Sequence, residues 1–229
     1  MTLTPDQWLA VALSLKVSLV ATLCSLPFGV VVAFALARGH FWGRQALNLL
    51  VHLPLVLPPV VTGYLLLRLF GHRGIAGAFL EQFGIVFAFR WTGAALAAAV
   101  MAFPLVVRTI RLSVEAVDPR LEQAAQTLGA SPPWIFATVT LPLILPGILA
   151  GAIIGFAKAL GEFGATITFV SNIPGQTQTL PTAIYSVLQV PGGEPQVLAL
   201  VVVSIALAAL ALVLAEWVGR ALARRIAGV

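Results

Sequence analysis

The sequence predicts an all-α polytopic membrane protein, one domain over residues 1–229, with five transmembrane helices. Of its 229 residues, 60% are apolar and only 9% are charged, whereas a soluble domain carries about 25% charged residues. This number of charged residues is too small to cover a surface that faces water. Most of the chain must therefore face lipid. In lipid, backbone groups are satisfied within helices rather than in open strands. Five apolar segments are long enough to cross a core of about 30 Å; they are approximately residues 8–37, 46–70, 91–113, 141–170 and 197–218.

Basic residues at the ends of these segments orient the chain. Eight of them fall on one side of the predicted membrane and two, Arg73 and Arg90, fall on the other. The positive-inside rule then places the N-terminus outside, the C-terminus in the cytoplasm, and residues 114–140 in a cytoplasmic loop. The net charge of +5 therefore indicates membrane topology and not nucleic-acid binding. The eight are Arg38, Arg44, Arg108, Arg111, Arg120, Arg220, Arg224 and Arg225.

The first span, residues 8–37, is longer than a crossing requires, so it must tilt, kink or protrude. It contains Lys16, eight residues after Trp8. A charge inside a span is costly, and two interpretations stay open. Lys16 either lies on an anion path, where contacts must be weak enough for cargo to leave, or extends its ammonium group to the outer head groups.

The second span, residues 46–70, contains several prolines. Pro54, Pro58 and Pro59 each remove a backbone donor and bend a helix, and Thr62 follows them. The prediction is a kinked segment. It either moves as a gate or holds a static kink that shapes the bundle.

The third span, residues 91–113, leads into a polar loop that favours helix. Residues 120–128 are good helix formers, and the small Ala124 and Ala125 allow a partner to approach closely. Gly129 follows where a helix is expected to stop.

A second short helix is expected to follow this stop. Ser131 can cap it, Pro132 and Pro133 suit its first turn, and Leu141-Pro142 leads back to the membrane. The result is a helix–turn–helix in the cytoplasm, which is either a docking element or an ordinary interfacial connector. Its apolar face would contain Trp134, Ile135, Phe136 and Val139.

The fourth span, residues 141–170, contains a stripe of glycines. Gly147, Gly151 and Gly155 repeat every four residues, so another helix can approach this face closely. That helix belongs either to the same chain or to a second copy across a dimer seam.

Two ionisable residues follow in the same span. Lys158 and Glu162 are four residues apart on one predicted helix face, where they can pair. Three interpretations stay open: they line the route of an anion, they lock a resting state, or they form a neutralised packing pair.

Between the fourth and fifth spans, residues 180–190 form an apolar stretch that opens with Pro181. It is too short to cross and is expected to lie at the interface or to re-enter the membrane. The fifth span, residues 197–218, then returns the chain to the cytoplasm.

The sequence offers no set of residues for catalysis or metal binding. The only cysteine is Cys24, which excludes an internal disulfide. His40 and His72 are expected on opposite sides of the membrane, so a shared metal site is not predicted. No glycine-rich phosphate loop ends in Lys-Ser or Lys-Thr, so ATP is not expected to bind to this chain.

The cytoplasmic loop resembles the EAA loop of ABC importer permeases. Two small residues, three intervening residues and a glycine are followed about a dozen residues later by Leu-Pro. The resemblance matches Ala124 and Ala125 to the alanine pair, Gly129 to the glycine, and Leu141-Pro142 to the closing pair. It implies that the first loop helix sits in a cleft of a cytoplasmic ATPase and transmits the ATPase's closure.

The loop departs from the family pattern at one position. The usual glutamate is Gln123 here, and Glu122 lies one residue earlier. Either Glu122 supplies the contact to the ATPase from a shifted position, or that contact is neutral. A solvated helix-surface charge is the alternative for Glu122.

The resemblance extends along the chain to the permease subunit of molybdate importers. It is carried by LSLKVS at residues 13–18, HLPLVLPPVVTGYLLL at 52–67 and GEFGATITFVSNIPG at 161–175. It implies a type I importer permease (MetI-like) fold in a bacterial cytoplasmic membrane. It further implies a homodimer, two copies of an ATPase that holds ATP and Mg²⁺, and an external anion-binding protein.

Other functions stay open as alternatives. Sulfate permeases share the GEFGA-type segment but are generally longer. A stand-alone secondary transporter would need internal repeats with broken helices at matching positions, and no clear repeat is visible. A membrane-embedded enzyme would need more clustered catalytic groups than Lys158 and Glu162 provide.

Overall fold

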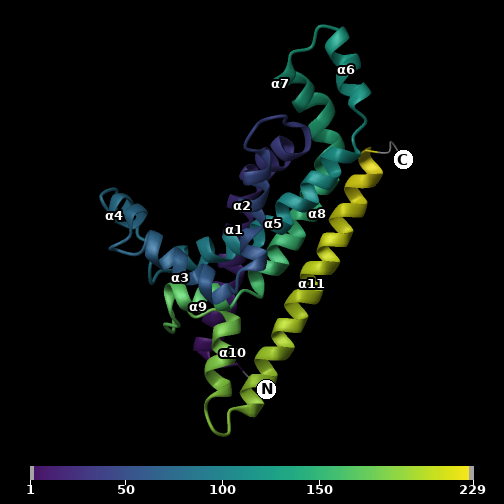
Figure 1. Ribbon diagram of the computed structural model, residues 1–229. Helices are drawn as coiled ribbons and strands as arrows, with labels where there is room; N and C mark the ends of the chain where they lie inside the picture. The colour runs from purple at the N-terminus through teal and green to yellow at the C-terminus, as the bar shows by residue number, and fades with distance from the viewer. Residues whose placement is uncertain (1–2, 227–229) are drawn as a thin grey trace.

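The computed structural model describes residues 3–226, with side chains described up to Trp217 except that of Ala215, and these residues form helices with no strand among them (Figure 1). The predicted all-α class is therefore confirmed for this part of the chain, and the outermost residues of the predicted 1–229 domain lie outside it. The elements are α1 Pro5–Arg38, α2 Arg44–Val56, α3 Pro59–Phe70, α4 Ile75–Glu81, α5 Trp91–Ala116, α6 Pro119–Thr127, α7 Pro132–Ile135, the π-helix η1 Phe136–Thr140, α8 Leu141–Leu160, α9 Gly164–Val170, α10 Leu180–Leu188 and α11 Glu194–Ile226.

Four helical runs within these residues are long and apolar enough to cross a membrane. A bent pair makes a fifth if α2 and α3 count as one span. The predicted number of five is thus reached only with a broken helix. The four runs are Pro5–Arg38, Trp91–Ala116, Pro132–Leu160 and Glu194–Leu214.

Helix α5 forms the centre of the bundle and packs against both α1 and α8, which also contact each other (Figure 1). In its most apolar stretch 61% of the residues are buried, against 6% in α11. Small side chains explain this position, because Ala94, Ala97 and Ala98 are fully buried and let neighbouring helices approach closely. Val106 and Ile110 continue the same core toward the other end of the helix.

Helix α1 spans the bundle from α10 to the loop that precedes α6. Thr4 and Gln7 form a reciprocal capping box at its start. The Ser14 hydroxyl accepts a hydrogen bond of 2.6 Å from the Leu180 amide at the start of α10. At the far end, Nη2 of Arg38 donates to the Val117 carbonyl at 2.7 Å. The start of α1 and the α6–α7 hairpin therefore lie at opposite ends of the molecule, as an odd number of crossings requires.

The kink predicted in the second span, residues 46–70, is confirmed, because the two helices α2 and α3 form this segment in place of one continuous helix. α2 and α3 are bent by 117° relative to each other. The residue before a proline avoids the helical region, and here two such residues follow each other. Leu57 precedes Pro58 with ψ 141°, and Pro58 precedes Pro59 with ψ 135°, so both are extended.

The predicted fourth span, residues 141–170, begins where α8 begins, but it is not one isolated helix. Helical structure runs without a gap from α7 through η1 into α8, so the second loop helix is continuous with the span. Pro142 accounts for the π-helix, because it has no N–H for the Thr138 carbonyl and its ring would collide with that oxygen. The Leu141 amide bonds to the Phe136 carbonyl instead. At the other end α8 stops at Leu160, and α9 begins only after a break of three residues.

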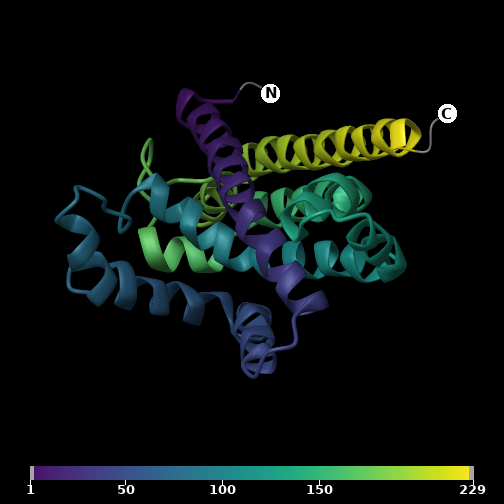
Figure 2. The same ribbon diagram turned by 90° about the horizontal axis from the view of Figure 1, so that it is seen from above.

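The short apolar stretch predicted at 180–190 forms α10, which packs against α1 and α11. Helix α11 is longer than the predicted 197–218 and lies at one side of the bundle, with α2, α3 and α4 at the other (Figure 2). It packs on α8 and α10 and leaves most of its apolar surface exposed. Such a surface suits lipid or a second subunit. The side chains of Arg220, Arg224 and Arg225, used for the predicted topology, lie outside the described part.

Candidate functional site

Helix α6 extends beyond the bundle and buries none of its residues (Figure 1). Asp118 caps its start, with its carboxylate accepting from the Arg120 amide at 2.9 Å. Its end is a Schellman motif, because the Ala130 amide bonds to the Ala125 carbonyl and the Gly129 amide to Gln126. Gly129 has φ +83°, a conformation that favours glycine, so the predicted helix stop is confirmed.

A hollow of about 650 Å³ lies between α6 and α7. Two large apolar side chains on it are exposed to an unusual degree, with Leu128 88% and Trp134 64% accessible. Ala124 is exposed and Ala125 half-buried, so a partner can approach the α6 backbone. Exposed apolar side chains beside small residues are what a docking surface requires. The hollow is lined by Ala125, Leu128, Gly129, Ala130, Ser131, Trp134 and Thr138.

The predicted apolar face of the second loop helix is divided between core and surface. Ile135 is buried and Phe136 half-buried, with the Phe136 ring edge-on to Phe34 of α1 at 5.4 Å. Trp134 instead faces outward. Ser131 occupies the predicted cap position, but its side chain makes no capping hydrogen bond. The hairpin is therefore anchored to the bundle through its second helix.

Glu122 points into the hairpin. Its Oε1 accepts a hydrogen bond of 2.8 Å from the Thr140 hydroxyl, and its Oε2 lies 3.9 Å from Nε of Arg38. The Glu122 side chain is only 18% exposed, so it is not a solvated surface charge. Gln123, which the resemblance matches to the usual glutamate, is exposed. The carboxylate thus ties α6 to η1 and to the end of α1.

Lys158 and Glu162 pair as predicted, with 2.9 Å between Nζ and Oε2. Glu162 is not on the helix face with Lys158, however, because α8 ends at Leu160. Its other oxygen accepts from the Ala165 amide at 3.1 Å, so it also caps the start of α9. Glu162 is 3% exposed, whereas the Lys158 side chain is 33% exposed. The pair fixes the break between α8 and α9.

The break between α2 and α3 lies against the break between α8 and α9, because α3 packs on α9. A Cβ added to Gly164 of α9 would lie 2.8 Å from Pro59 Cβ, and one added to Gly63 of α3 would lie 2.8 Å from Thr168 Cβ. Both positions therefore need glycine for close packing. Thr62 is buried beside them, and its hydroxyl makes no hydrogen bond with the described residues. The Pro58–Pro59 bend and the break at Glu162 thus form one joint.

The two other predicted features pack within the chain. Gly147, Gly151 and Gly155 are buried against α5, where an added Cβ at Gly155 would lie 2.6 Å from Val106. The glycine stripe is therefore an internal packing face between α8 and α5. Lys16 is exposed, and its ammonium lies 3.7 Å from the ring centroid of Trp91. This cation–π contact joins α1 to the start of α5.

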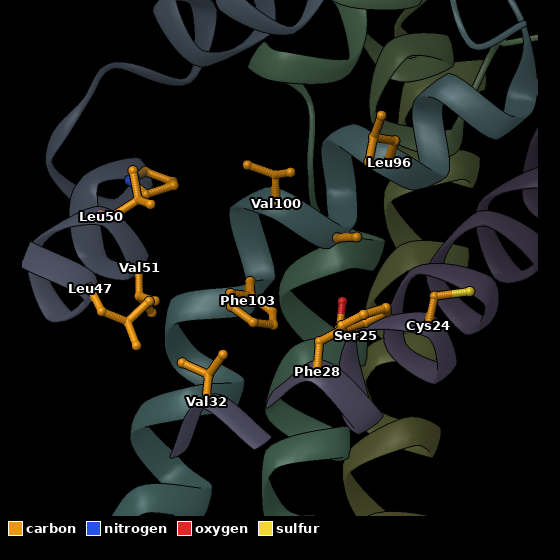
Figure 3. A pocket seen from close by; sticks show the side chains of 12 residues that line it. Cys24, Ser25, Phe28, Val32, Leu47, Leu50, Val51, Leu96, Val100 and Phe103 are labelled. Carbon is orange, nitrogen blue, oxygen red and sulfur yellow. The ribbon is translucent and has the colours of Figure 1, made fainter. Parts of the chain in front are cut away.

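An apolar cavity of about 500 Å³ lies among α1, α2 and α5 (Figure 3). Figure 3 shows that side chains such as Phe28, Val100 and Phe103 surround it, with Cys24 and Ser25 as the polar exceptions. No charged side chain lines it. An unpaired anion is strongly disfavoured in such surroundings, so this cavity is not suited to an anion path.

Sequence reasoning missed several residues that the structure brings together. Thr140, 18 residues after Glu122, donates a hydrogen bond to its carboxylate. Arg38, at the end of α1, lies beside the same carboxylate. Arg38 had been used only to orient the chain. Nothing in the local pattern around Thr140 marks it as a partner of Glu122. The only signal in the sequence was that Glu122 is an acid with no basic residue three or four positions away on the same predicted helix.

The fold defines a polytopic membrane protein that carries an exposed helical hairpin. Comparison with known proteins places it more closely. Residues 25–227 match the family described as the binding-protein-dependent transport system inner membrane component, so the chain belongs to that family. The molybdenum transport system permease protein ModB of Escherichia coli K12 is 58% identical over 221 residues, which cover 96% of each chain.

More distant relatives agree with this placement. The sulfate transport system permease protein CysT of Salmonella typhimurium is 39% identical over 185 residues, covering 81% of this chain and 67% of that protein. Among solved structures, the inward-facing MetNI methionine ABC transporter superposes with a TM-score of 0.70 at 17% identity, covering 95% of this chain and 94% of that one. A bacterial alginate ABC transporter in complex with its alginate-bound periplasmic protein gives 0.73 at 19% identity, covering 97% and 80%. These two share the fold of type I ABC importer permeases.

Proposed function

We propose that this chain is the permease subunit of an ATP-driven importer that moves molybdate, or tungstate, across the bacterial inner membrane into the cell. The observation that carries the proposal is the α6–α7 hairpin, a helix with no buried residue held out from a transporter-family bundle. A helix of nine residues is marginally stable alone, so its exposure indicates a partner that covers it.

The choice of molybdate is supported by the pattern of similarity. Identity is 58% to the molybdenum permease ModB over nearly the whole chain, and 39% to the sulfate permease CysT over a shorter part. Sulfate import is therefore the second candidate. A stand-alone anion transporter is disfavoured, because it would leave the exposed hairpin without a role.

The hairpin would act as the mechanical link to the ATPase. In this proposal two partner ATPase subunits hold ATP and Mg²⁺ and carry out hydrolysis, while this chain contributes no catalytic group. Ala124, Leu128 and Trp134 would contact a cleft of the ATPase. Because η1 and α8 continue from α7 without a gap, a displacement of the hairpin would pass directly to the membrane helix.

Two further partners complete the proposal. One bundle is small for a path with alternating access, so we infer a homodimer, with the exposed apolar side of α11 available for lipid or the second copy. The alginate transporter was solved with its periplasmic protein, which supports an external binding protein for this chain as well. Specificity would lie mainly in that protein, with the path providing weak contacts so that cargo leaves.

The joint between the broken helices is the proposed moving part of the path. Lys158 and Glu162 hold α8 to α9, and α9 packs on α3 beside the Pro58–Pro59 bend. Opening the joint would expose Thr62 and the Lys158 ammonium, both able to bind an oxyanion weakly.

Uptake of labelled molybdate at low external concentration tests the proposal in cells with and without this chain. Loss of uptake on deletion, with competition by tungstate and not by sulfate, is the expected result. Lost sulfate uptake with unchanged molybdate uptake would move the substrate to sulfate. Uptake that survives deletion of the ATPase would contradict the coupling role.

A further inference from the structure

A polar cavity lies between α2 and α5, close to the end of the bundle that carries the α6–α7 hairpin. It encloses about 320 Å³ and is separate from the joint at Glu162. Its residues recur at helical spacing on two facing helices, so their side chains converge. They are Asn48 and His52 on α2, with Arg108, Arg111, Leu112 and Glu115 on α5.

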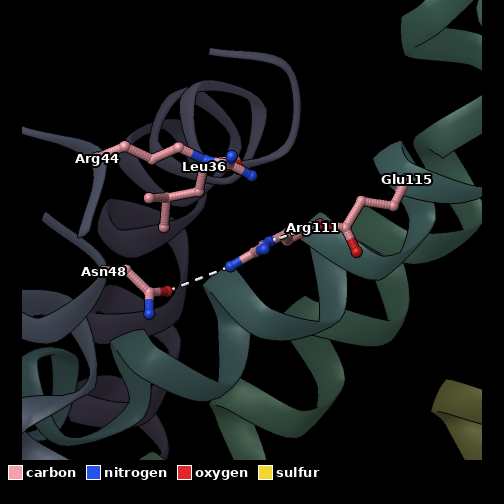
Figure 4. Close-up of polar contacts among 5 residues, drawn as sticks. All are labelled: Leu36, Arg44, Asn48, Arg111 and Glu115. Atoms are coloured by element: carbon pink, nitrogen blue, oxygen red, sulfur yellow. Dashed lines mark hydrogen bonds and ion pairs between the residues drawn. The ribbon is translucent and has the colours of Figure 1, made fainter. Parts of the chain in front are cut away.

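Arg111 is held in place by one residue from each helix (Figure 4). Its Nη1 donates to the Asn48 side-chain oxygen at 3.2 Å, and its Nε donates to Glu115 at 2.7 Å. A guanidinium group has five N–H donors, so three remain for a ligand. The Arg111 guanidinium group is therefore already held in a fixed orientation before a ligand binds.

Arg108 adds a second guanidinium one turn earlier on the same face. It is exposed and makes no hydrogen bond or ion pair with any described residue. Side chains three residues apart on a helix are neighbours, so both guanidinium groups can reach one ligand. With Glu115 as the only acid lining the cavity, an excess of positive charge remains.

His52 limits what the ligand can be. Its Nδ1 lies 2.8 Å from the Asn48 carbonyl. A carbonyl only accepts, so Nδ1 donates and Nε2 is left for a ligand. The free N–H groups of Arg108 and Arg111 outnumber the acceptors that line this cavity, which favours an anion with several oxygens.

We propose that this pocket binds a tetrahedral oxyanion between Arg108 and Arg111. Planar guanidinium groups match such oxygens by paired hydrogen bonds. The anion is either a free oxyanion on the cytoplasmic side or the phosphate of an anionic lipid, whose head groups are known to bind in basic pockets between spans. The inference goes beyond the proposed function, because the site does not require the cargo to be molybdate.

The test measures binding to the intact transporter in nanodiscs without the external binding protein. One arm uses labelled molybdate in phosphatidylcholine discs. The other uses mixed phosphatidylcholine and phosphatidylglycerol discs and counts retained phosphatidylglycerol by native mass spectrometry. The variant is Arg108→Gln, which breaks no contact within the described chain. The matched control is Arg73→Gln, at an exposed position in the loop that follows α3.

Arg108→Gln is expected to lower the affinity for one of the two probes by about tenfold, whereas Arg73→Gln leaves that affinity unchanged. Arg108→Lys, which keeps the charge and loses the planar fork, should fall between them. Loss in the molybdate arm identifies a free oxyanion, and loss in the lipid arm identifies a head group. Equal binding of both probes by Arg108→Gln and wild type, or no binding of either probe to wild type, would overturn the proposal.

Discussion

The Thr140 hydroxyl donates a hydrogen bond of 2.8 Å to the Glu122 carboxylate, joining α6 to the π-helix that leads into the membrane. Thr140 is 1% exposed, so the bond is shielded from water. Arg38 places a positive charge 3.9 Å from the same carboxylate. An isolated helix as short as α6 is unstable. These contacts therefore make the hairpin a unit that can transmit force to α8.

Replacing Thr140 with valine should loosen this unit. The shape is kept, but a largely covered carboxylate loses its donor, which costs about 1–3 kcal/mol. We expect more ATP hydrolysed per molybdate imported by proteoliposomes that contain the whole transporter.

Thr109→Val is the matched control. Thr109 lies on α5, outside the α6–α7 hairpin, and its hydroxyl donates to the Leu105 carbonyl of its own helix at 2.8 Å. The ratio of hydrolysis to transport should stay at the wild-type value. An equal rise in both variants would show that the Glu122–Thr140 bond has no part in coupling.

Gly129→Ala should impair coupling by straining the end of α6. At φ +83° an alanine costs about 1 kcal/mol, and nothing lies within 4 Å of the added Cβ. The effect is therefore confined to the backbone. Gly84→Ala introduces the same strain at φ +74°, again with no neighbour within 4 Å, away from the hairpin.

Uptake and ATPase activity measured together separate the two glycine variants. Gly129→Ala should hydrolyse ATP with reduced import, whereas Gly84→Ala should keep the wild-type ratio. Normal import by Gly129→Ala would argue against a precise fit of α6 to its partner.

The hairpin was predictable because its signals are local. Ala124 and Ala125 favour helix, Gly129 provides the left-handed stop, and Pro132 suits a helix start. Each acts within a few residues, so no knowledge of the tertiary fold is needed. The central position of α5 was less visible, since its mean hydropathy of 1.8 is lower than the 3.1 of the exposed α11.

The break between α8 and α9 and the long-range contacts were not predictable in the same way. The prolines themselves signalled the bend at Pro58–Pro59, but apolar residues run on past Gly161, so hydropathy joins two helices that the backbone separates. Glu162 was placed on a helix face, although it caps the next helix. The partners of Glu122 depend on where α1 ends, which follows from packing rather than from a motif.

Adding one methyl group to the glycine stripe should separate α8 from α5. In Gly155→Ala the new Cβ would lie 2.6 Å from Val106, so the helices must shift, at a cost of about 1–3 kcal/mol. Gly161→Ala, whose nearest atom would be 3.8 Å away, is the control. Thermal unfolding of the purified transporter should show a lower Tm for Gly155→Ala alone. A Tm equal to that of the control would show that the interface can adapt.

Lys158→Ala should destabilise the joint between α8 and α9, because it leaves the buried Glu162 carboxylate without its cation. We expect a loss of about 1–3 kcal/mol, less than for a fully buried pair because one third of the Lys158 side chain is exposed. Adding Glu162→Gln should restore the Tm, since glutamine keeps an acceptor for the Ala165 amide and carries no charge. Molybdate uptake by the double variant then separates two roles for the lysine. Normal uptake at restored Tm assigns the pair to packing, whereas uptake that stays low places the Lys158 charge on the anion path. A double variant no more stable than Lys158→Ala would contradict the charge-burial argument itself.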